Sequence, residues 1–105
     1  MAYEVDHTDD FGDRWETLSD AEQADVGAVV DLLEIRGPHL PFPHSSAVHG
    51  SKHGHMRELR TQPRGRPYRV LYAFDPLRAA ILLLGGDKTG KDDWYDRVIP
   101  QADRL

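Results

Sequence analysis

Residues 56–84, MRELRTQPRGRPYRVLYAFDPLRAAILLL, decide the fold of this chain. Three strand-like segments follow one another in this stretch: residues 56–62, 67–74 and 79–84. The last of them is apolar from end to end, which is typical of a strand covered on both faces. Only short turns separate the segments, and one begins with Asp75-Pro76, a pair favoured at the start of a β-turn. The stretch therefore predicts an antiparallel meander.

The residues before this meander predict a short strand and two helices. The alternating segment 3–7 is strand-like, and Thr8 can cap a helix that follows it. The apolar residues of that helix share one face: Phe11, Trp15 and Leu18. Ser19 and Glu22 form a capping box, which begins a second helix that Gly37-Pro38 ends.

Two loops and a closing helix complete the predicted order. Residues 37–55 hold three Pro, three Gly, three Ser and five His without periodicity, which indicates a long loop. Residues 85–91 predict a polar loop. Apolar residues spaced from Trp94 to Ala102 predict a last helix, which Pro100 should kink or shorten. We therefore expect one α+β domain, residues 1–105, in the order β-α-α-β-β-β-α.

The composition narrows the cellular setting. The chain has no cysteine, which excludes disulfides and favours a reducing compartment. Its first segment, MAYEVDHTDD, is acidic and lacks the apolar stretch of a secretory signal. Its longest apolar run, residues 79–84, is far shorter than the about 20 residues that a membrane helix needs. A cytoplasmic protein with no membrane segment is expected.

The net charge of −5 conceals a sharp division along the chain. Residues 1–50 carry a net charge of −9, residues 51–91 carry +6, and residues 92–105 carry −2. The net charge of the whole chain argues against nucleic-acid binding, but one segment of the chain is strongly basic. This segment coincides with the predicted meander.

The basic segment is rich in arginine. Six arginines lie within residues 57–78. A guanidinium group binds phosphate through paired hydrogen bonds and stays charged at any working pH. Three tyrosines near the segment could stack on nucleobases: Tyr68, Tyr72 and Tyr95. An ordinary solvated sheet face is the alternative interpretation, and the residues alone leave both open.

The histidines of the predicted loop suggest proton transfer more than metal binding. Their spacing matches no recognised zinc pattern, and no cysteine is available. His53 and His55 lie between Lys52 and Arg57, where a histidine beside phosphate-binding cations can act as general acid or base. Simple solvation is the alternative. Residues 85–91 lack the spacing of a phosphate-binding loop, so a nucleoside triphosphate site is not expected.

Three segments together resemble a known family. They are Met56-Arg57-Glu58-Leu59-Arg60, Pro67-Tyr68-Arg69-Val70-Leu71-Tyr72, and ILLLGGDKTGK at residues 81–91. In this order they are similar to toxins of bacterial type II toxin–antitoxin pairs, in the phage-derived HigB-like branch of the RelE/ParE superfamily. The similarity covers about residues 50–95. It implies a RelE-like α+β fold: an N-terminal strand, a two-helix hairpin, an antiparallel meander and a C-terminal helix.

The resemblance implies an endoribonuclease that cleaves mRNA on the ribosome and so inhibits translation. The family uses no metal or other cofactor, and the 2′-hydroxyl of the RNA attacks the adjacent phosphate. Fixed cations suit this reaction because its transition state carries extra negative charge. The residues expected to be catalytic are Arg60, Arg69, Lys88, Lys91 and Tyr95, carried over from the resemblance, together with His55. Those expected to bind RNA are Lys52, His53, Arg57, Arg64 and Arg66.

Two alternatives stay open, because ParE-like relatives share this scaffold and because the chain departs from the family pattern. Gly86-Asp87-Lys88-Thr89 stands where the branch commonly has F-x-K-K, so one of the paired lysines is missing. Glu58 places an acid in the basic strand. The first alternative is a ParE-like inhibitor that binds DNA gyrase. The second is a degenerate toxin that only binds its antitoxin and represses their operon.

The resemblance also implies partners. The expected ones are mRNA, the ribosome and a HigA-like antitoxin with a helix-turn-helix domain, with which a heterotetramer could form. The acidic residues 1–50 would face a basic partner. The alternative is that these acids are only the solvated surface of the helices.

Overall fold

The meander predicted from residues 56–84 lies at the centre of the computed structural model, which describes residues 3–52, 54–75, 79–90 and 93–105. The strands are β1 (Val5–His7), β2 (Ser45–Ala47), β3 (Arg57–Thr61), β4 (Tyr68–Phe74) and β5 (Ala80–Asp87). The helices are α1 (Asp9–Glu16), α2 (Asp20–Arg36) and α3 (Trp94–Asp103). The α+β class and the predicted order are confirmed, with one added strand.

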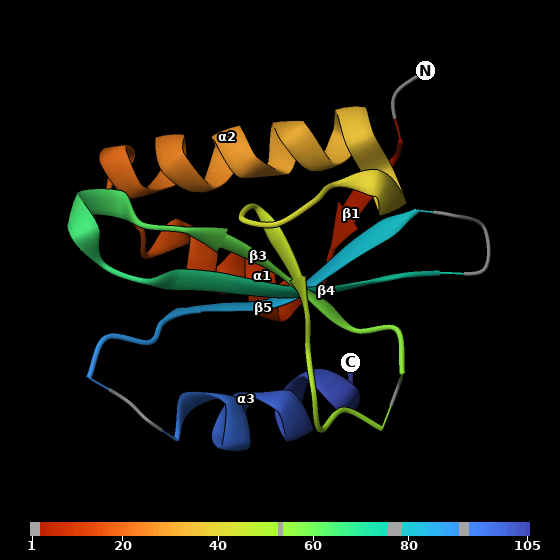
Figure 1. Cartoon of the computed structure of the whole chain (residues 1–105). Helices are drawn as coiled ribbons and strands as arrows, with labels where there is room; N and C mark the ends of the chain where they lie inside the picture. The colour runs from red at the N-terminus through yellow and green to blue at the C-terminus, as the bar shows by residue number, and fades with distance from the viewer. Residues whose placement is uncertain (1–2, 53, 76–78, 91–92) are drawn as a thin grey trace.

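The five strands form one sheet in the order β1-β5-β4-β3-β2. The pairs β2–β3, β3–β4 and β4–β5 are antiparallel, and β1 is parallel to β5. Figure 1 shows α2 on one side of the sheet and α3 on the other. The sheet therefore has two covered faces, called below the α2 face and the α3 face.

The helices begin and end where the local signals place them. The Thr8 hydroxyl accepts a hydrogen bond from the amide of Phe11, which caps α1. Ser19 and Glu22 make both hydrogen bonds of the capping box before α2. Gly37 ends α2 with a φ of 53°, a conformation that favours glycine. The last helix, α3, continues past Pro100 to Asp103, so the proline does not end it.

Each face of the sheet packs against its own apolar cluster. On the α2 face, Phe11 and three α2 residues pack against alternate residues of the strands. The buried α2 residues are Val26, Val29 and Leu33. On the α3 face, Leu71 and Leu83 pack against Trp94, Ile99 and Ala102. This alternation along β4 is the reason that its side chains are buried on both sides.

The long loop predicted for residues 37–55 is wrong in part, because it contains β2 and a short 3₁₀ turn, Gly37–His39. Ser45-Ser46-Ala47 has no apolar period, so its own sequence gives no strand signal. Pairing with β3 makes it a strand, and the hydroxyl of the buried Ser45 lies 2.7 Å from the Tyr72 hydroxyl.

The polar loop predicted for residues 85–91 also begins too early, because β5 continues to Asp87. Glycine is depleted in strands, but here two neighbouring aromatic rings require it. A Cβ on Gly85 would lie 2.9 Å from the Tyr68 hydroxyl, and one on Gly86 would lie 3.0 Å from Trp94 Nε1. Close packing of the rings therefore explains both glycines.

Candidate active site

A group of charged residues lies on the α3 face of strands β3 and β4. Because side chains alternate along a strand, Glu58 and Arg60 point to the face opposite that of the core residue Leu59. The register pairs Arg60 with Arg69 across the two strands. The same register that builds the core therefore collects a carboxylate and two guanidinium groups on one face.

Glu58 is the centre of this group. It is 3% exposed, and its Oε1 lies 3.2 Å from Nε of Arg69 and 3.5 Å from Nη1 of Arg60. Arg69 is 5% exposed and also donates a hydrogen bond of 3.0 Å from Nη1 to the Tyr68 carbonyl. A buried carboxylate is tolerated when cations and hydrogen-bond donors surround it, and these partners supply that environment.

Tyr95 completes the surroundings of Glu58. Its hydroxyl donates to both carboxylate oxygens, at 2.7 Å to Oε1 and 2.8 Å to Oε2. Packing of Trp94 against the sheet positions this first turn of α3. Burial, followed by the adjacent Glu58 carboxylate, raises the pKa of Tyr95 to about 12. The phenol therefore keeps its proton at neutral pH and presents it to Glu58.

We expect Tyr95 to contribute stability that disappears in strong alkali. Its pKa is higher in the folded chain than the ordinary value of 10.0, so the folded state holds this proton more tightly. The contribution is complete below about pH 10 and is lost as the pH rises through about 12. Unfolding free energies of the wild type and Tyr95→Phe should show the wild-type advantage shrinking across this interval. A constant difference would contradict the assignment.

Lys88 lies beside Tyr95. Its Nζ is 5.2 Å from the centroid of the Tyr95 ring, a distance at which a cation is attracted to the ring face. Its backbone amide donates to the Pro67 carbonyl at 2.9 Å, which anchors the residue after β5. Lys88 therefore adds a cation next to the Tyr95–Glu58 pair.

A cleft of about 300 Å³ opens beside this group. It is lined by Pro43, His44, Arg60, Thr61, Gln62 and Arg69. The backbone amide of Arg60 donates to the His44 carbonyl at 2.9 Å, continuing the pairing between β2 and β3. His44, Arg60 and Arg69 therefore lie side by side across neighbouring segments. The Arg60 side chain is 28% exposed, so it can reach a ligand in the cleft.

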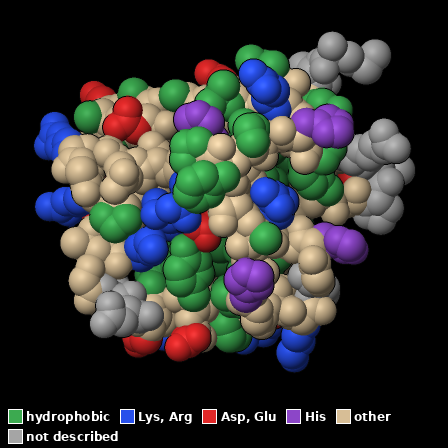
Figure 2. Space-filling view, in the orientation of Figure 1, with side chains coloured by type: hydrophobic (Ala, Val, Ile, Leu, Met, Phe, Trp, Pro, Cys, Tyr) green, Lys and Arg blue, Asp and Glu red, His purple; other side chains and the backbone are tan. Residues whose placement is uncertain are grey.

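Phe42 stands next to the guanidinium of Arg60. The Arg60 Cζ lies 5.1 Å from the centroid of the Phe42 ring, which is 69% exposed. An exposed aromatic ring against a cation is a surface on which a nucleobase can stack. In Figure 2, Lys and Arg side chains gather near the middle of the visible face beside an acidic one, with hydrophobic side chains around them.

The structure brings together four of the predicted catalytic residues and separates the fifth. Arg60, Arg69, Tyr95 and Lys88 surround Glu58 directly or through Tyr95. His55 lines a different depression, with Phe74 and Pro38. Lys91, the remaining predicted catalytic residue, lies outside the described residues.

The residues predicted to bind RNA are spread over the molecule. Arg57 points to the α2 face, where its Nε donates to the Ser45 hydroxyl at 3.0 Å. Arg64 is exposed in the turn between β3 and β4. Arg66 directly follows this turn, and its Nη1 lies 3.7 Å from Oδ2 of Asp87. The exposed Lys52 donates its backbone amide to the Asp103 carboxylate at 2.9 Å. His53 lies outside the described residues.

Sequence reasoning missed two residues of this site. The sequence pattern presents Glu58 as a departure from a basic strand, whereas the structure shows that two arginines converge on it. His44 belongs to the segment whose sequence predicts an irregular loop, and only the pairing between β2 and β3 places it beside Arg60. The alternation of Glu58 and Arg60 along β3 was a usable signal, since it puts both on one face.

The structure also bears on metal and membrane binding. Within the described ranges of the chain, no three His, Cys, Asp or Glu side chains come close enough together to hold a metal ion. Figure 2 likewise shows the histidines scattered over the visible face. None of the described helices has the length and apolar character needed to cross a lipid bilayer.

Comparison with known proteins gives two kinds of similarity. The profile of the family described as "Phage derived protein Gp49-like (DUF891)" matches residues 13–105. The candidate toxin HigB3 of Mycobacterium tuberculosis is 48% identical over 94 residues, covering 88% of this chain and 81% of that protein. The family match includes the whole of the charged group on the α3 face.

Solved structures with the same fold share little sequence with the chain. The isolated RelE toxin of E. coli superposes with a TM-score of 0.68 at 13% identity, covering 92% of this chain and 96% of RelE. The archaeal RelE–RelB complex of Pyrococcus horikoshii gives a TM-score of 0.61 at 19% identity, covering 86% of this chain and 99% of the matched chain. At these identities the superpositions establish the fold.

Proposed function

Because this chain belongs to the phage-derived Gp49-like family, in the HigB branch of the RelE/ParE toxins, we propose that it is an endoribonuclease that cleaves mRNA on the ribosome. The observation that carries the proposal is the group around Glu58, which joins two arginines and a tyrosine beside an open cleft. Residues 1–105 would act as one toxin domain. Since ribosomes and mRNA are its proposed targets, its action is placed in the cytoplasm.

The proposed reaction needs no metal. The 2′-oxygen of the RNA attacks the adjacent phosphorus and loses its proton, the bond from phosphorus to the 5′-oxygen breaks, and that oxygen gains a proton. The products are a 2′,3′-cyclic phosphate and a 5′-hydroxyl. The chain must therefore supply a proton acceptor, a proton donor and positive charge at the phosphate.

Arg60 and Lys88 supply the positive charge in this proposal. Arg60 lines the cleft and is partly exposed, so its guanidinium can hold the phosphate oxygens as their charge grows. Lys88 lies at the ring of Tyr95 and adds a second cation. Arg69 is a positioning residue, because it is almost fully buried and is held by Glu58 and backbone carbonyls.

Tyr95 and His44 move the protons. A phenol with a pKa of about 12 is a poor base alone, but its hydroxyl already donates to Glu58. As the Tyr95 oxygen receives the proton of the 2′-hydroxyl, its own proton passes to the carboxylate. His44, which lines the same cleft, gives a proton to the leaving 5′-oxygen. In this proposal His44 has the role of general acid, for which the sequence indicates His55.

The toxin class also implies an inhibitory partner. The RelE of Pyrococcus horikoshii was solved in complex with RelB, and the family resemblance predicts a HigA-like antitoxin for this chain. We propose that such an antitoxin, encoded next to this chain, binds it and blocks its action on the ribosome.

Induced expression of the wild-type chain should arrest growth and produce new mRNA 5′ ends that primer extension can map. His44→Ala should lower the cleavage rate about 10²-fold, because it removes the proposed proton donor. His55→Ala should cleave like the wild type, since His55 lines another part of the surface.

The outcome separates the candidate functions. Growth arrest with intact mRNA and damaged DNA would indicate the gyrase inhibitor instead, and no arrest at all would indicate the degenerate toxin. Loss of cleavage in His55→Ala with full activity in His44→Ala would show that the cleft is not the site.

A further inference from the structure

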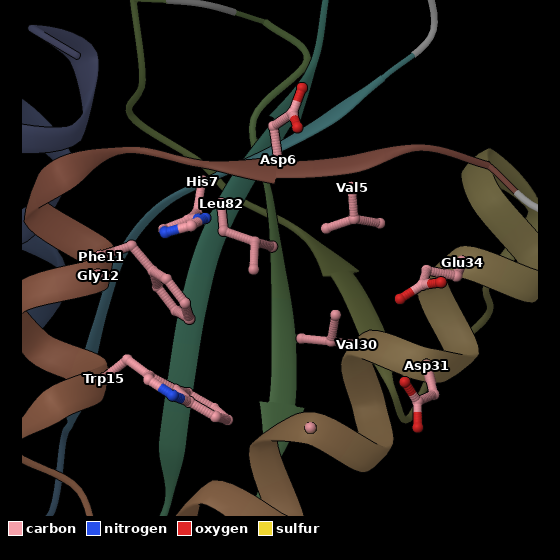
Figure 3. Close-up of a pocket in the computed structure, with 11 residues that line it drawn as sticks. Val5, Asp6, His7, Phe11, Gly12, Trp15, Val30, Asp31, Glu34 and Leu82 are labelled. Atoms are coloured by element: carbon pink, nitrogen blue, oxygen red, sulfur yellow. The ribbon is translucent and has the colours of Figure 1, made fainter.

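A second hollow lies on the far side of the sheet from the Glu58 group, between β1, α1 and α2. It encloses about 270 Å³. Its apolar wall consists of Val5, Phe11, Trp15, Val30 and Leu82. Figure 3 shows the two rings of α1 and the side chains of the sheet and α2 arranged around this space. We call it the helix groove.

Two glycines keep the helix groove open. Gly12 in α1 and Gly27 in α2 both line it without a side chain. A Cβ on Gly27 would lie 3.9 Å from the ring of Trp15, which is ordinary contact, so a larger side chain there would extend into the hollow. An apolar cavity of about 150 Å³ already holds a benzene molecule, so the groove has room for one large apolar side chain.

The rim of the groove is acidic. Asp31 and Glu34 of α2 line it, and Figure 3 shows their carboxylates along the α2 side of the space, whereas the Asp6 side chain points away on the other side of β1. They belong to the half of the chain whose net charge is −9. A polyanion such as RNA would be repelled by this rim, whereas a protein segment with Lys or Arg beside an apolar residue would complement it.

We propose that the helix groove binds an amphipathic helix of the antitoxin, with one large apolar side chain in the hollow and Lys or Arg side chains against the acidic rim. The proposal rests on the proposed function, which makes an antitoxin the partner of this chain. It adds where that partner docks and what chemistry it presents. The groove is on the α2 side of the sheet, so an antitoxin held there leaves the cleft beside Arg60 uncovered by this contact.

The test measures binding of the purified product of the adjacent reading frame by isothermal titration calorimetry. Gly27→Leu fills the groove and suits a helix better than glycine, so folding is retained. Asp31→Lys reverses a charge on the rim. Each variant should weaken binding at least tenfold. The matched control is Asp25→Lys, an exposed α2 residue outside the groove, which should bind like the wild type.

Three results would overturn the proposal. The first is wild-type affinity in both groove variants. The second is absence of binding by the wild-type chain itself. The third is a wild-type dimer that Gly27→Leu dissociates, which would assign the groove to a second copy of this chain. Failure of the proposed function is seen separately, as intact mRNA after induction of the wild-type chain without the adjacent product.

Discussion

Replacing Glu58 with alanine is expected to reduce the free energy of unfolding by about 3–5 kcal/mol, the usual cost of removing one partner from a buried ion pair. Glu58 and Arg69 are 3% and 5% exposed, so the remaining guanidinium would stay in the interior without its carboxylate. The Tyr95 hydroxyl would also lose the acceptor to which it now donates. Urea unfolding followed by circular dichroism measures the loss.

Two further variants identify the cause. Glu58→Gln keeps an oxygen that can accept from Tyr95, so it should lose less stability than Glu58→Ala. Removing both charges, with Glu58→Leu and Arg69→Met in one chain, should recover much of the loss, because no buried charge is left unpaired. If Glu58→Ala unfolds at the same urea concentration as the wild type, the carboxylate does not hold this face together.

Replacing Arg60 with alanine is expected to slow mRNA cleavage by about 10²–10³-fold, as loss of one charge-stabilising donor commonly does. Its guanidinium is the exposed cation of the cleft, and the growing negative charge on the phosphate would have lost its nearest donor. Because Arg69 and Tyr95 still hold the Glu58 carboxylate, Arg60→Ala should lose much less stability than Glu58→Ala. Single-turnover cleavage of a ribosome-bound mRNA gives the rate.

The control for Arg60→Ala removes the same charge elsewhere. Arg104 is exposed near the end of the chain, beyond α3, and Arg104→Ala should cleave at the wild-type rate. Equal rates for Arg60→Ala and the wild type would exclude Arg60 from the reaction. An equal loss in both variants would point to the overall charge of the chain and not to the cleft.

The difference between Arg60 and Arg69 could not be obtained from the sequence. Both are strand arginines in the segment that carries the family resemblance, and the resemblance gives both the same role, stabilising charge on the phosphate. The structure leaves Arg60 at the cleft and buries Arg69 against Glu58. The exposure of a side chain depends on which distant segments of the chain pack over it. Here these segments are mainly the neighbouring strands and α3.

The different positions of His44 and His55 could not be predicted from the sequence either. Neither has a local pattern that marks it, since both lie in a segment without periodicity. The pairing of β2 with β3 brings His44 beside Arg60, while His55 lines another depression of the surface, together with Phe74. A pairing between segments that are distant in the sequence is set by the whole sheet and has no signature in either segment.

The sequence by itself determined the helices and the central strands of this protein, because their causes are local. The cap at Thr8, the capping box of Ser19 and Glu22 and the alternation along β4 each act within a few residues. It also determined that the basic charge lies in the meander, since charge follows directly from composition. The tertiary structure alone decided that Glu58 collects these cations and that an acidic groove forms behind the sheet. Both depend on side chains that meet only when distant segments pack together.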